Sequence, residues 1–228
     1  MLAGLAALLL GACSQGPHTP PPDPVEKPVL GLVTSLPIVF GTQFSLEAGS
    51  PLLSALEKHY EVRALAATDA DSLTGIDLLL MAHALPQTAE NLVALDEWVR
   101  GGGDVLLLAD PLLTWETGLP MGHPQAPPLY FGDTGLLGHW GVTLEGPIEA
   151  SEQAGVAVSG AGRFVPTDGN CGTRHGGFIA DCIVGEGKAT LIADADFIES
   201  GSPESSALVT TELANFARVD FARAQIER

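Results

Sequence analysis

GIDLLLMAHALPQTAENLVALDEWVRGGGDVLLLADP, residues 75–111, is the stretch that decides the fold. It contains two short apolar runs, Ile76–Ala82 and Val105–Ala109, each of strand length and too short for an independent helix. Both runs are apolar at consecutive positions rather than only at every second one. This pattern is typical of a parallel strand that is covered on both faces.

A helix is predicted between the two runs. Thr88 can cap its N-terminus, and Leu92, Leu95 and Val99 recur at the spacing of one helical face. Gly101–Gly103 ends the helix, because the turn there favours a left-handed residue. Strand, helix and strand form a βαβ unit, and its crossover is expected to be right-handed.

Further strands and helices are predicted on both sides of this unit. They are a strand at Val29–Thr34, a helix from Ser50-Pro51, a half-polar strand at Glu61–Ala66, a helix at Asp133–Trp140, short strands around Val156–Val158 and Arg163–Val165, a hairpin of Phe178–Val184 with Ala189–Ala193, and a last helix from Ser202-Pro203. The order predicts an α/β three-layer sandwich with a mostly parallel, flavodoxin-like sheet and a C-terminal β-hairpin.

Three segments carry a family resemblance. DLLLMAHALPQTAENLVALDEWVRGGGDVLLLADP (77–111) looks like the core of auxiliary extracytoplasmic domains of ABC-type transport systems, the gliding-motility type among them. LLGHWGVTL (136–144) is similar to the family's L-L-x-x-W-G-V segment. GEGKATLIADADF (185–197) is similar to its glycine hairpin followed by D-(S/A)-D-F. The resemblance implies a class I glutamine amidotransferase fold without its catalytic cysteine, and it implies no enzymatic activity.

The residues themselves also argue against amidotransferase chemistry. That chemistry needs a cysteine of low pKa on a tight turn after a strand. The strand that should bear it ends in Ala109-Asp110-Pro111, whereas Cys171 and Cys182 lie far downstream. No G-x-S-x-G motif occurs, so the nucleophile of the α/β-hydrolases is missing as well.

Composition limits the partners of this chain. A protein of 228 residues can form one sizeable α/β domain or two small ones. The formal net charge is −18 and only ten Lys and Arg are present, which argues against nucleic acid as a partner. The same charge disfavours electrostatic adhesion to anionic lipid.

The N-terminal segment predicts export and lipidation. Residues 1–12, MLAGLAALLLGA, suit the apolar core of a signal peptide and are too short to span a bilayer, although no Lys or Arg precedes them. Leu10-Gly11-Ala12-Cys13 resembles the bacterial lipobox, in which the cysteine is acylated. Cys13 would then anchor the protein on the periplasmic side of the cell envelope, and Ser14 resembles an outer-membrane sorting signal.

A proline-rich tether is predicted to follow Cys13 and to end at Pro28. Its six prolines favour polyproline II, so the globular domain at 29–228 would stand some distance from the membrane. Residues 115–128 form a second irregular stretch, inside the domain. A loop of this length in a compact domain is usually functional or mobile.

Candidate ligand or partner residues lie where the parallel strands end. In an open α/β sheet, ligands bind outside the carboxyl ends of the strands. Ser35, His83, Asp110, Asp194 and Asp196 are expected along this rim, and Trp115 in the nearby loop could line a groove.

Each of these polar residues also has a structural interpretation. Asp110 can accept backbone N–H groups and start a turn. Asp194 and Asp196 alternate, so only one would face the rim if the strand continued, and His83 could be an ordinary loop histidine. A cation site would require Asp110, Asp194 and His83 to converge. Neither H-E-x-x-H nor an EF-hand loop occurs, so no metal or other cofactor is predicted.

Cys171 and Cys182 are predicted to form a disulfide, because an even pair in an exported protein is normally oxidised. Two buried free thiols are the alternative. The residues between them include Arg174 and His175 in an otherwise acidic chain, and they are expected to form a surface loop for partner contact.

Two functions fit these observations. The first is a non-catalytic periplasmic lipoprotein that binds a protein partner, such as an ABC permease or an envelope complex. The alternative is a hydrolase of the cell envelope that uses Asp110, Asp194 or His83 as acid and base. The hydrolase requires a histidine within hydrogen-bond reach of a buried carboxylate in a concave pocket.

Overall fold

The computed structural model describes residues 27–39, 49–120 and 122–226, with side chains up to Phe216. The predicted signal peptide, Cys13 and most of the tether lie outside the described residues. No helix within the described ranges is long and apolar enough to cross a membrane.

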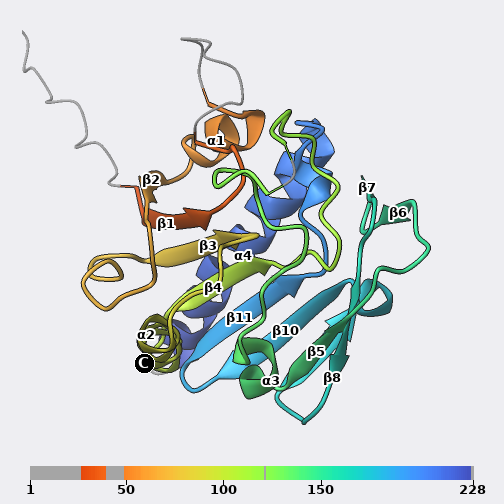
Figure 1. Ribbon diagram of the computed structural model, residues 1–228. Coiled ribbons are helices and arrows are strands. Elements are labelled where there is room, and N and C mark those ends of the chain that lie inside the picture. Colours follow the sequence, from red (N-terminus) through yellow and green to blue (C-terminus); the bar gives the residue numbers. More distant parts are fainter. Residues whose placement is uncertain (1–26, 40–48, 121, 227–228) are drawn as a thin grey trace, which may run out of the picture.

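A single seven-stranded sheet forms the centre of the domain (Figure 1). In sheet order its strands are β2 (Glu61–Ala64), β1 (Val29–Thr34), β3 (Leu78–Ala82), β4 (Asp104–Leu108), β11 (Gly187–Ile192), β10 (Ile179–Val184) and β9 (Cys171–Arg174). The strands from β2 to β11 pair in parallel, and β10 and β9 continue the sheet antiparallel. The five parallel strands follow the flavodoxin-like order 2-1-3-4-5. The predicted fold class is therefore confirmed, including the hairpin of β10 and β11.

Helices cover both faces of this sheet. They are α1 (Pro51–Leu56), α2 (Ala89–Arg100), α3 (Leu136–Trp140) and α4 (Pro203–Ile226), with short 3-10 turns η1 (His175–Gly177) and η2 (Asp196–Ile198). The crossovers β1–α1–β2 and β3–α2–β4 run in opposite directions along the sheet. If both are right-handed, α1 and α2 lie on opposite faces. Helix α4 packs against α1, which gives the third layer (Figure 1).

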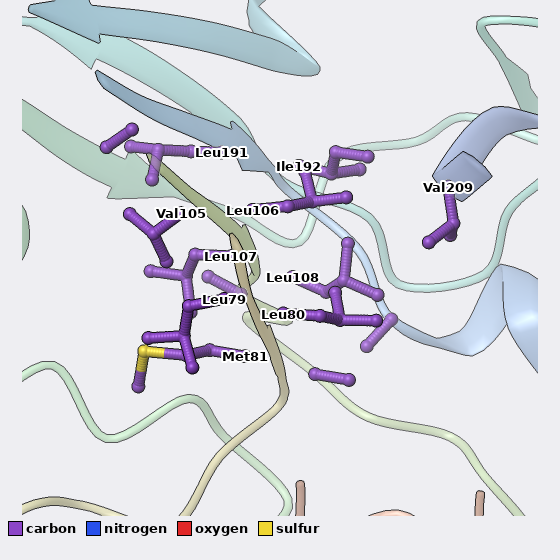
Figure 2. Close-up of a cluster of buried hydrophobic side chains, with 14 of the residues drawn as sticks. Leu79, Leu80, Met81, Val105, Leu106, Leu107, Leu108, Leu191, Ile192 and Val209 are labelled. Carbon is purple, nitrogen blue, oxygen red and sulfur yellow. The ribbon is translucent and has the colours of Figure 1, made fainter. Parts of the chain in front are cut away.

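The core is built on β3, β4 and β11, the strands of the unit predicted from residues 75–111. Successive residues of a strand point to opposite faces, and all five residues of β3 and of β4 are buried, so both faces are covered. Val209 of α4 lies on the side of Leu80 and Leu108, whereas Leu79 and Leu107 occupy the other side (Figure 2).

The connecting helix behaves as its sequence predicts. The hydroxyl of Thr88 accepts a hydrogen bond from the backbone N–H of Asn91 at 3.3 Å. Leu95 and Val99 are fully buried, and Leu92 is half-buried. Gly102 adopts φ 108°, which only glycine tolerates easily, and the chain turns there into β4.

Residues 111–170 form an insertion between β4 and β9. It contains α3, two small antiparallel pairs, and an irregular stretch without strands or helices in its described part. The pairs are β5 (Val142–Glu145) with β8 (Arg163–Pro166), and β6 (Glu152–Gln153) with β7 (Val156–Ala157). Trp140 of α3 is buried, and its indole Nε1 donates to Asp96 of α2 at 3.0 Å, which ties the insertion to this helix.

Candidate functional site

Three neighbouring parallel strands end in polar residues that are buried. His83 follows β3, Asp110 lies shortly after β4, and Asp194 shortly after β11. All three are completely inaccessible to solvent. Because the carboxyl ends of these strands lie at the same edge of the sheet, the predicted rim exists, but it is not an open surface.

Asp110 is held entirely by backbone N–H groups. Its Oδ1 accepts from Leu112 at 2.8 Å, and its Oδ2 accepts from Ala195 at 2.9 Å and from Asp196 at 3.3 Å. These bonds join the segment after β4 to the segment after β11. The structural interpretation of Asp110, an acceptor for backbone N–H groups at a strand end, is therefore confirmed.

Asp194 and Asp196 are both buried, because β11 ends at Ile192 and the alternation of a strand no longer applies. Asp194 Oδ1 accepts from the N–H of Phe197 at 3.1 Å. Asp196 Oδ2 accepts from the N–H and the hydroxyl of Thr114, each at 2.7 Å. The second oxygens, Asp194 Oδ2 and Asp196 Oδ1, have no hydrogen-bond partner among the described residues.

Burial makes these carboxyl groups hard to ionise. Desolvation raises the pKa of Asp110 to about 6. Desolvation, with repulsion from Asp110, raises the pKa of Asp194 to about 8. Desolvation also raises the pKa of Asp196. The cluster therefore holds protons at a pH at which exposed carboxyl groups have lost theirs.

His83 packs beside this cluster without an ion pair. Its Nε2 lies 2.8 Å from the carbonyl oxygen of Pro128, and its Nδ1 has no partner among the described residues. Burial lowers the pKa of His83, so the ring is neutral at physiological pH. Its backbone has φ 43°, an unusual value for a residue other than glycine.

The side chain of Ser35 binds a backbone group at the rim. Its hydroxyl donates to the carbonyl oxygen of His83 at 2.5 Å. Next to it, the hydroxyl of Thr34 donates to the carbonyl of Ala82 at 2.8 Å. These bonds tie the ends of β1 and β3 together at the point where the strand order reverses.

A segment of the insertion covers the rim. We call residues 111–120 and 122–131 the capping arm. Its two limbs are joined by a hydrogen bond from Leu113 N to Leu129 O at 2.8 Å, and it returns to the sheet where Phe131 N donates to Asp110 O at 2.8 Å. The bonds of Asp196 to Thr114 and of His83 to Pro128 hold it down. The arm therefore occupies the crevice in which α/β proteins of this type bind ligands.

Both limbs of the capping arm line a largely apolar hollow. A hollow of about 440 Å³ is lined by Leu113, Trp115, Pro120, Pro127 and Leu129, among others. Trp115 thus lines a groove, as expected from the sequence. The large apolar residues exposed on or beside the arm are Leu85, Leu119, Leu129 and Tyr130.

A second hollow, of about 340 Å³, borders Asp196. Its lining combines two carboxyl groups, three hydroxyl groups and apolar side chains; the residues are Thr114, Ala157, Val158, Ser159, Asp196, Phe197, Glu199 and Ser200. Asp196 is thus the one rim residue predicted from the sequence that lines this cavity.

The cluster does not form a metal site. Among the described residues, no group of three or more His, Cys, Asp and Glu is arranged to hold a metal ion. Asp110, Asp194 and His83 come close in the fold, but they bind backbone groups. The geometry also lacks the pair that the hydrolase alternative requires, since neither ring nitrogen of His83 bonds a carboxylate among the described residues.

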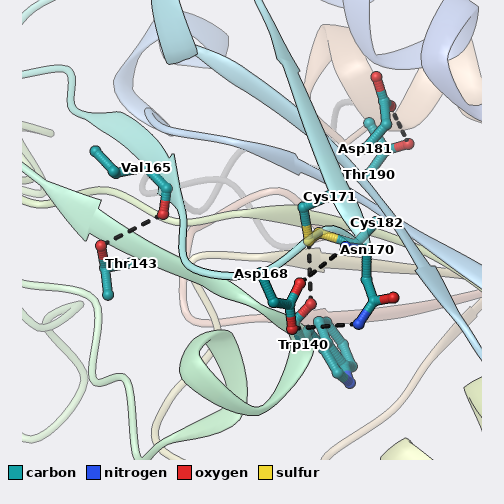
Figure 3. The surroundings of a disulfide bond; sticks show 9 residues. All are labelled: Trp140, Thr143, Val165, Asp168, Asn170, Cys171, Asp181, Cys182 and Thr190. Carbon is teal, nitrogen blue, oxygen red and sulfur yellow. Dashed lines mark hydrogen bonds between the residues drawn. A yellow bond between two sulfur atoms is a disulfide. The ribbon is translucent and has the colours of Figure 1, made fainter.

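The predicted disulfide between Cys171 and Cys182 is present (Figure 3). It links directly paired residues of β9 and β10, with Cα atoms 4.1 Å apart. Cys171 Sγ lies 3.0 Å from the carbonyl oxygen of Trp140. This is a van der Waals contact and not a hydrogen bond, because a disulfide sulfur carries no hydrogen to donate. The disulfide therefore sits in the core beside the insertion.

The expectation of a surface loop between the two cysteines was wrong. These residues form β9, η1 and the start of β10 at the edge of the sheet. Arg174 is not free for a partner, because it donates to Asp181 Oδ2 at 2.7 Å and to Glu212 Oε2 of α4 at 2.6 Å. The pattern of β9 was hidden by Gly172, since glycine is a poor strand former, whereas Gly176 and Gly177 lie in η1.

Two site features were missed at the level of sequence. Thr114 and the carbonyl of Pro128 hold the arm on the rim, but neither belongs to a recognisable motif. The only signal was the long proline-rich stretch, which predicts an irregular loop and not the surface it covers.

No protein-family profile and no curated protein matches this chain. Solved structures resemble it at low identity. The mmIFT52 N-terminal domain has a TM-score of 0.55 and 13% identity, covering 84% of this chain and 97% of that one. A ThuA-like protein from Bacteroides uniformis has a TM-score of 0.42 and 9% identity, covering 86% and 93%. The first likeness supports the fold alone, and the second is too weak to support an argument.

Proposed function

We propose that this protein is a non-catalytic, lipid-anchored domain of the cell envelope that binds a partner protein through its capping arm. The observation that carries the proposal is the arm itself. It closes the strand-end crevice, binds the buried polar residues from inside, and presents apolar side chains outside. The polar rim residues therefore support a surface instead of contacting a substrate.

The apolar character of this surface favours a protein partner. Leu85 and Tyr130 are 56% and 61% exposed, and Leu129, which lines the hollow together with Trp115, is 46% exposed. Aromatic and aliphatic side chains around a concavity are typical of protein-binding surfaces. The family resemblance of residues 77–111, 136–144 and 185–197 supports an ABC-type permease or an associated envelope complex as the partner.

Acylation at Cys13 would keep the domain at the membrane where such a partner resides. Mass spectrometry of the mature protein from membranes should show an N-terminal acylated cysteine, and Cys13→Ala should release the protein from the membrane fraction. Recovery of wild-type protein with an unmodified Cys13 would contradict the anchoring.

Site-specific crosslinking tests the surface. A photoreactive residue at Leu85 or Leu129 should crosslink, in intact cells, to a permease or envelope subunit identified by mass spectrometry. The matched control is Ile183 on β10, which is also 56% exposed but lies away from the arm. Equal crosslinking from Ile183, or turnover of envelope peptides or glycans by the purified protein, would overturn the proposal.

A further inference from the structure

The hollow of the capping arm combines an apolar lining with one acidic residue. Leu113, Trp115, Leu119 and Leu129 contribute apolar side chains, and Glu116 is the only charged residue among the described residues that line it. Resting on the function proposed above, we propose that this hollow receives an apolar side chain of the partner protein that is flanked in sequence by Lys or Arg.

The chain around the arm contains no basic side chain. From residue 101 to residue 162, a range that includes the whole arm and most of the insertion, there is neither Lys nor Arg. The same holds from residue 189 to residue 217, a range that includes η2 and the start of α4. A basic partner segment would therefore meet no positive side chain from either range, whereas an acidic segment would meet uncompensated carboxylates.

Two acidic residues lie next to each other at the hollow. The backbone N–H of Glu116 donates to Glu199 Oε1 at 3.0 Å, and both residues are exposed. Neither forms an ion pair with a described residue, whereas Asp96, Glu145 and Asp181 each pair with an arginine. A Lys or Arg of the partner would supply the missing positive charge, and two neighbouring negative charges attract it more strongly than one.

The lining requires the partner segment to be apolar as well as basic. Leu119 and Leu129 are 39% and 46% exposed, and covering such side chains removes apolar surface from water. Exposed ion pairs contribute less to affinity, and they mainly set the rate of association and the choice of partner. An anionic lipid surface could also take up apolar side chains, but the carboxylates beside the hollow disfavour it.

Crosslinking from a photoreactive residue at Leu129, with the full chain in isolated membranes, tests this partner class. The attached partner peptide should carry Lys or Arg within about four residues, or about 13 Å of extended chain, of the attachment point. Glu116→Gln combined with Glu199→Gln should lower the crosslinking yield at least about threefold at about 0.05 M salt. Raising the salt to about 0.5 M should bring the wild type close to this variant, because charges are then screened beyond about 5 Å.

A matched control separates the charge at the hollow from the charge of the whole chain. Asp71→Asn combined with Glu97→Gln removes two charges from exposed positions that do not line the hollow, and it should change the yield by less than about twofold. Misfolding of the test variant is not expected, because glutamine at position 199 keeps the oxygen that accepts from the N–H of residue 116.

The possible failures of the two proposals differ. The basic partner class is wrong, although the partner-binding function stands, if the mapped partner segment lacks Lys and Arg. It is equally wrong if the Glu116→Gln and Glu199→Gln variant crosslinks as well as the wild type, or no more weakly than the control variant. Attachment only to lipid or to a second copy of this chain, or no attachment from Leu129 at all, would overturn the partner-binding function and the basic partner class together.

Discussion

The hydroxyl and the backbone N–H of Thr114 both bond one carboxylate oxygen of Asp196, each at 2.7 Å. Thr114 belongs to the capping arm and Asp196 follows the last parallel strand, 82 residues later in the chain. This pair therefore fastens the arm to the strand ends that it covers.

Thr114→Val should loosen the capping arm while preserving its shape. The variant loses the hydroxyl bond to Asp196 but keeps the backbone bond, so we expect a loss of about 2 kcal/mol in the free energy of unfolding. Amide exchange within residues 111–131 should become faster, while exchange in β3 and β4 stays slow. Thr173→Val is the control, because Thr173 is exposed on β9 and its side chain forms no hydrogen bond with the described residues. Unchanged exchange in the arm would contradict the fastening role.

Asp194 should make the protein less stable as the pH rises. Its folded pKa of about 8 lies above the ordinary value of 3.8, so the folded state binds the proton more tightly. The resulting contribution to the free energy of unfolding is fully present below pH 3.8 and is lost as the pH rises through about 8. The lowered pKa of His83 acts below its ordinary value of 6.5, outside this window.

Thermal midpoints measured between about pH 6.5 and pH 9 should therefore fall for the wild type. Asp194→Asn, which stays neutral and can still accept from Phe197 N–H, should flatten this slope. Asp71→Asn removes an exposed charge and should leave the slope as in the wild type. The same slope in the wild type and in Asp194→Asn would exclude a buried, protonated Asp194.

Arg174 should matter more for stability than an exposed arginine in a similar ion pair. The side chain of its partner Glu212 is only 5% exposed, so Arg174→Ala would leave a buried carboxylate unpaired. We expect a loss on the order of 3 kcal/mol in the free energy of unfolding. Arg163→Ala breaks the exposed pair with Glu145 and should cost less than about 1 kcal/mol.

Replacing both members of the buried pair tests the cause. Arg174→Ala combined with Glu212→Leu should regain much of the stability, because no buried charge remains. If the double variant is no more stable than Arg174→Ala alone, the unpaired burial of Glu212 is not the cause of the loss.

The disulfide should stabilise the edge of the sheet. Cys171 and Cys182 are 11 residues apart, and closing a loop of this length is worth about 3 kcal/mol. Replacing both with alanine should lower the denaturant midpoint accordingly, and a reducing agent should lower the wild-type midpoint but leave the variant unchanged. A midpoint of the wild type that does not respond to reduction would show that the bond adds nothing to stability.

The sequence by itself determined the central βαβ unit, because its strands and helix depend on residues that are close together in the chain. The apolar runs of β3 and β4, the Thr88 cap and the glycine stop of α2 act within a few residues of each other, so their effects can be recognised without a structure. The cysteine pair was equally recognisable. The strand ends also predicted which polar residues would lie at one edge of the sheet.

Only the tertiary structure decided what those polar residues do. Asp110 bonds the backbone of Asp196, 86 residues later in the chain, and His83 bonds Pro128, 45 residues later. Neither contact leaves a local pattern, because the first depends on the pairing of β4 with β11 and the second on how the capping arm folds back over the strand ends. Whether the rim was an open ligand site or a covered support depended on these long-range contacts, and they made it a covered support.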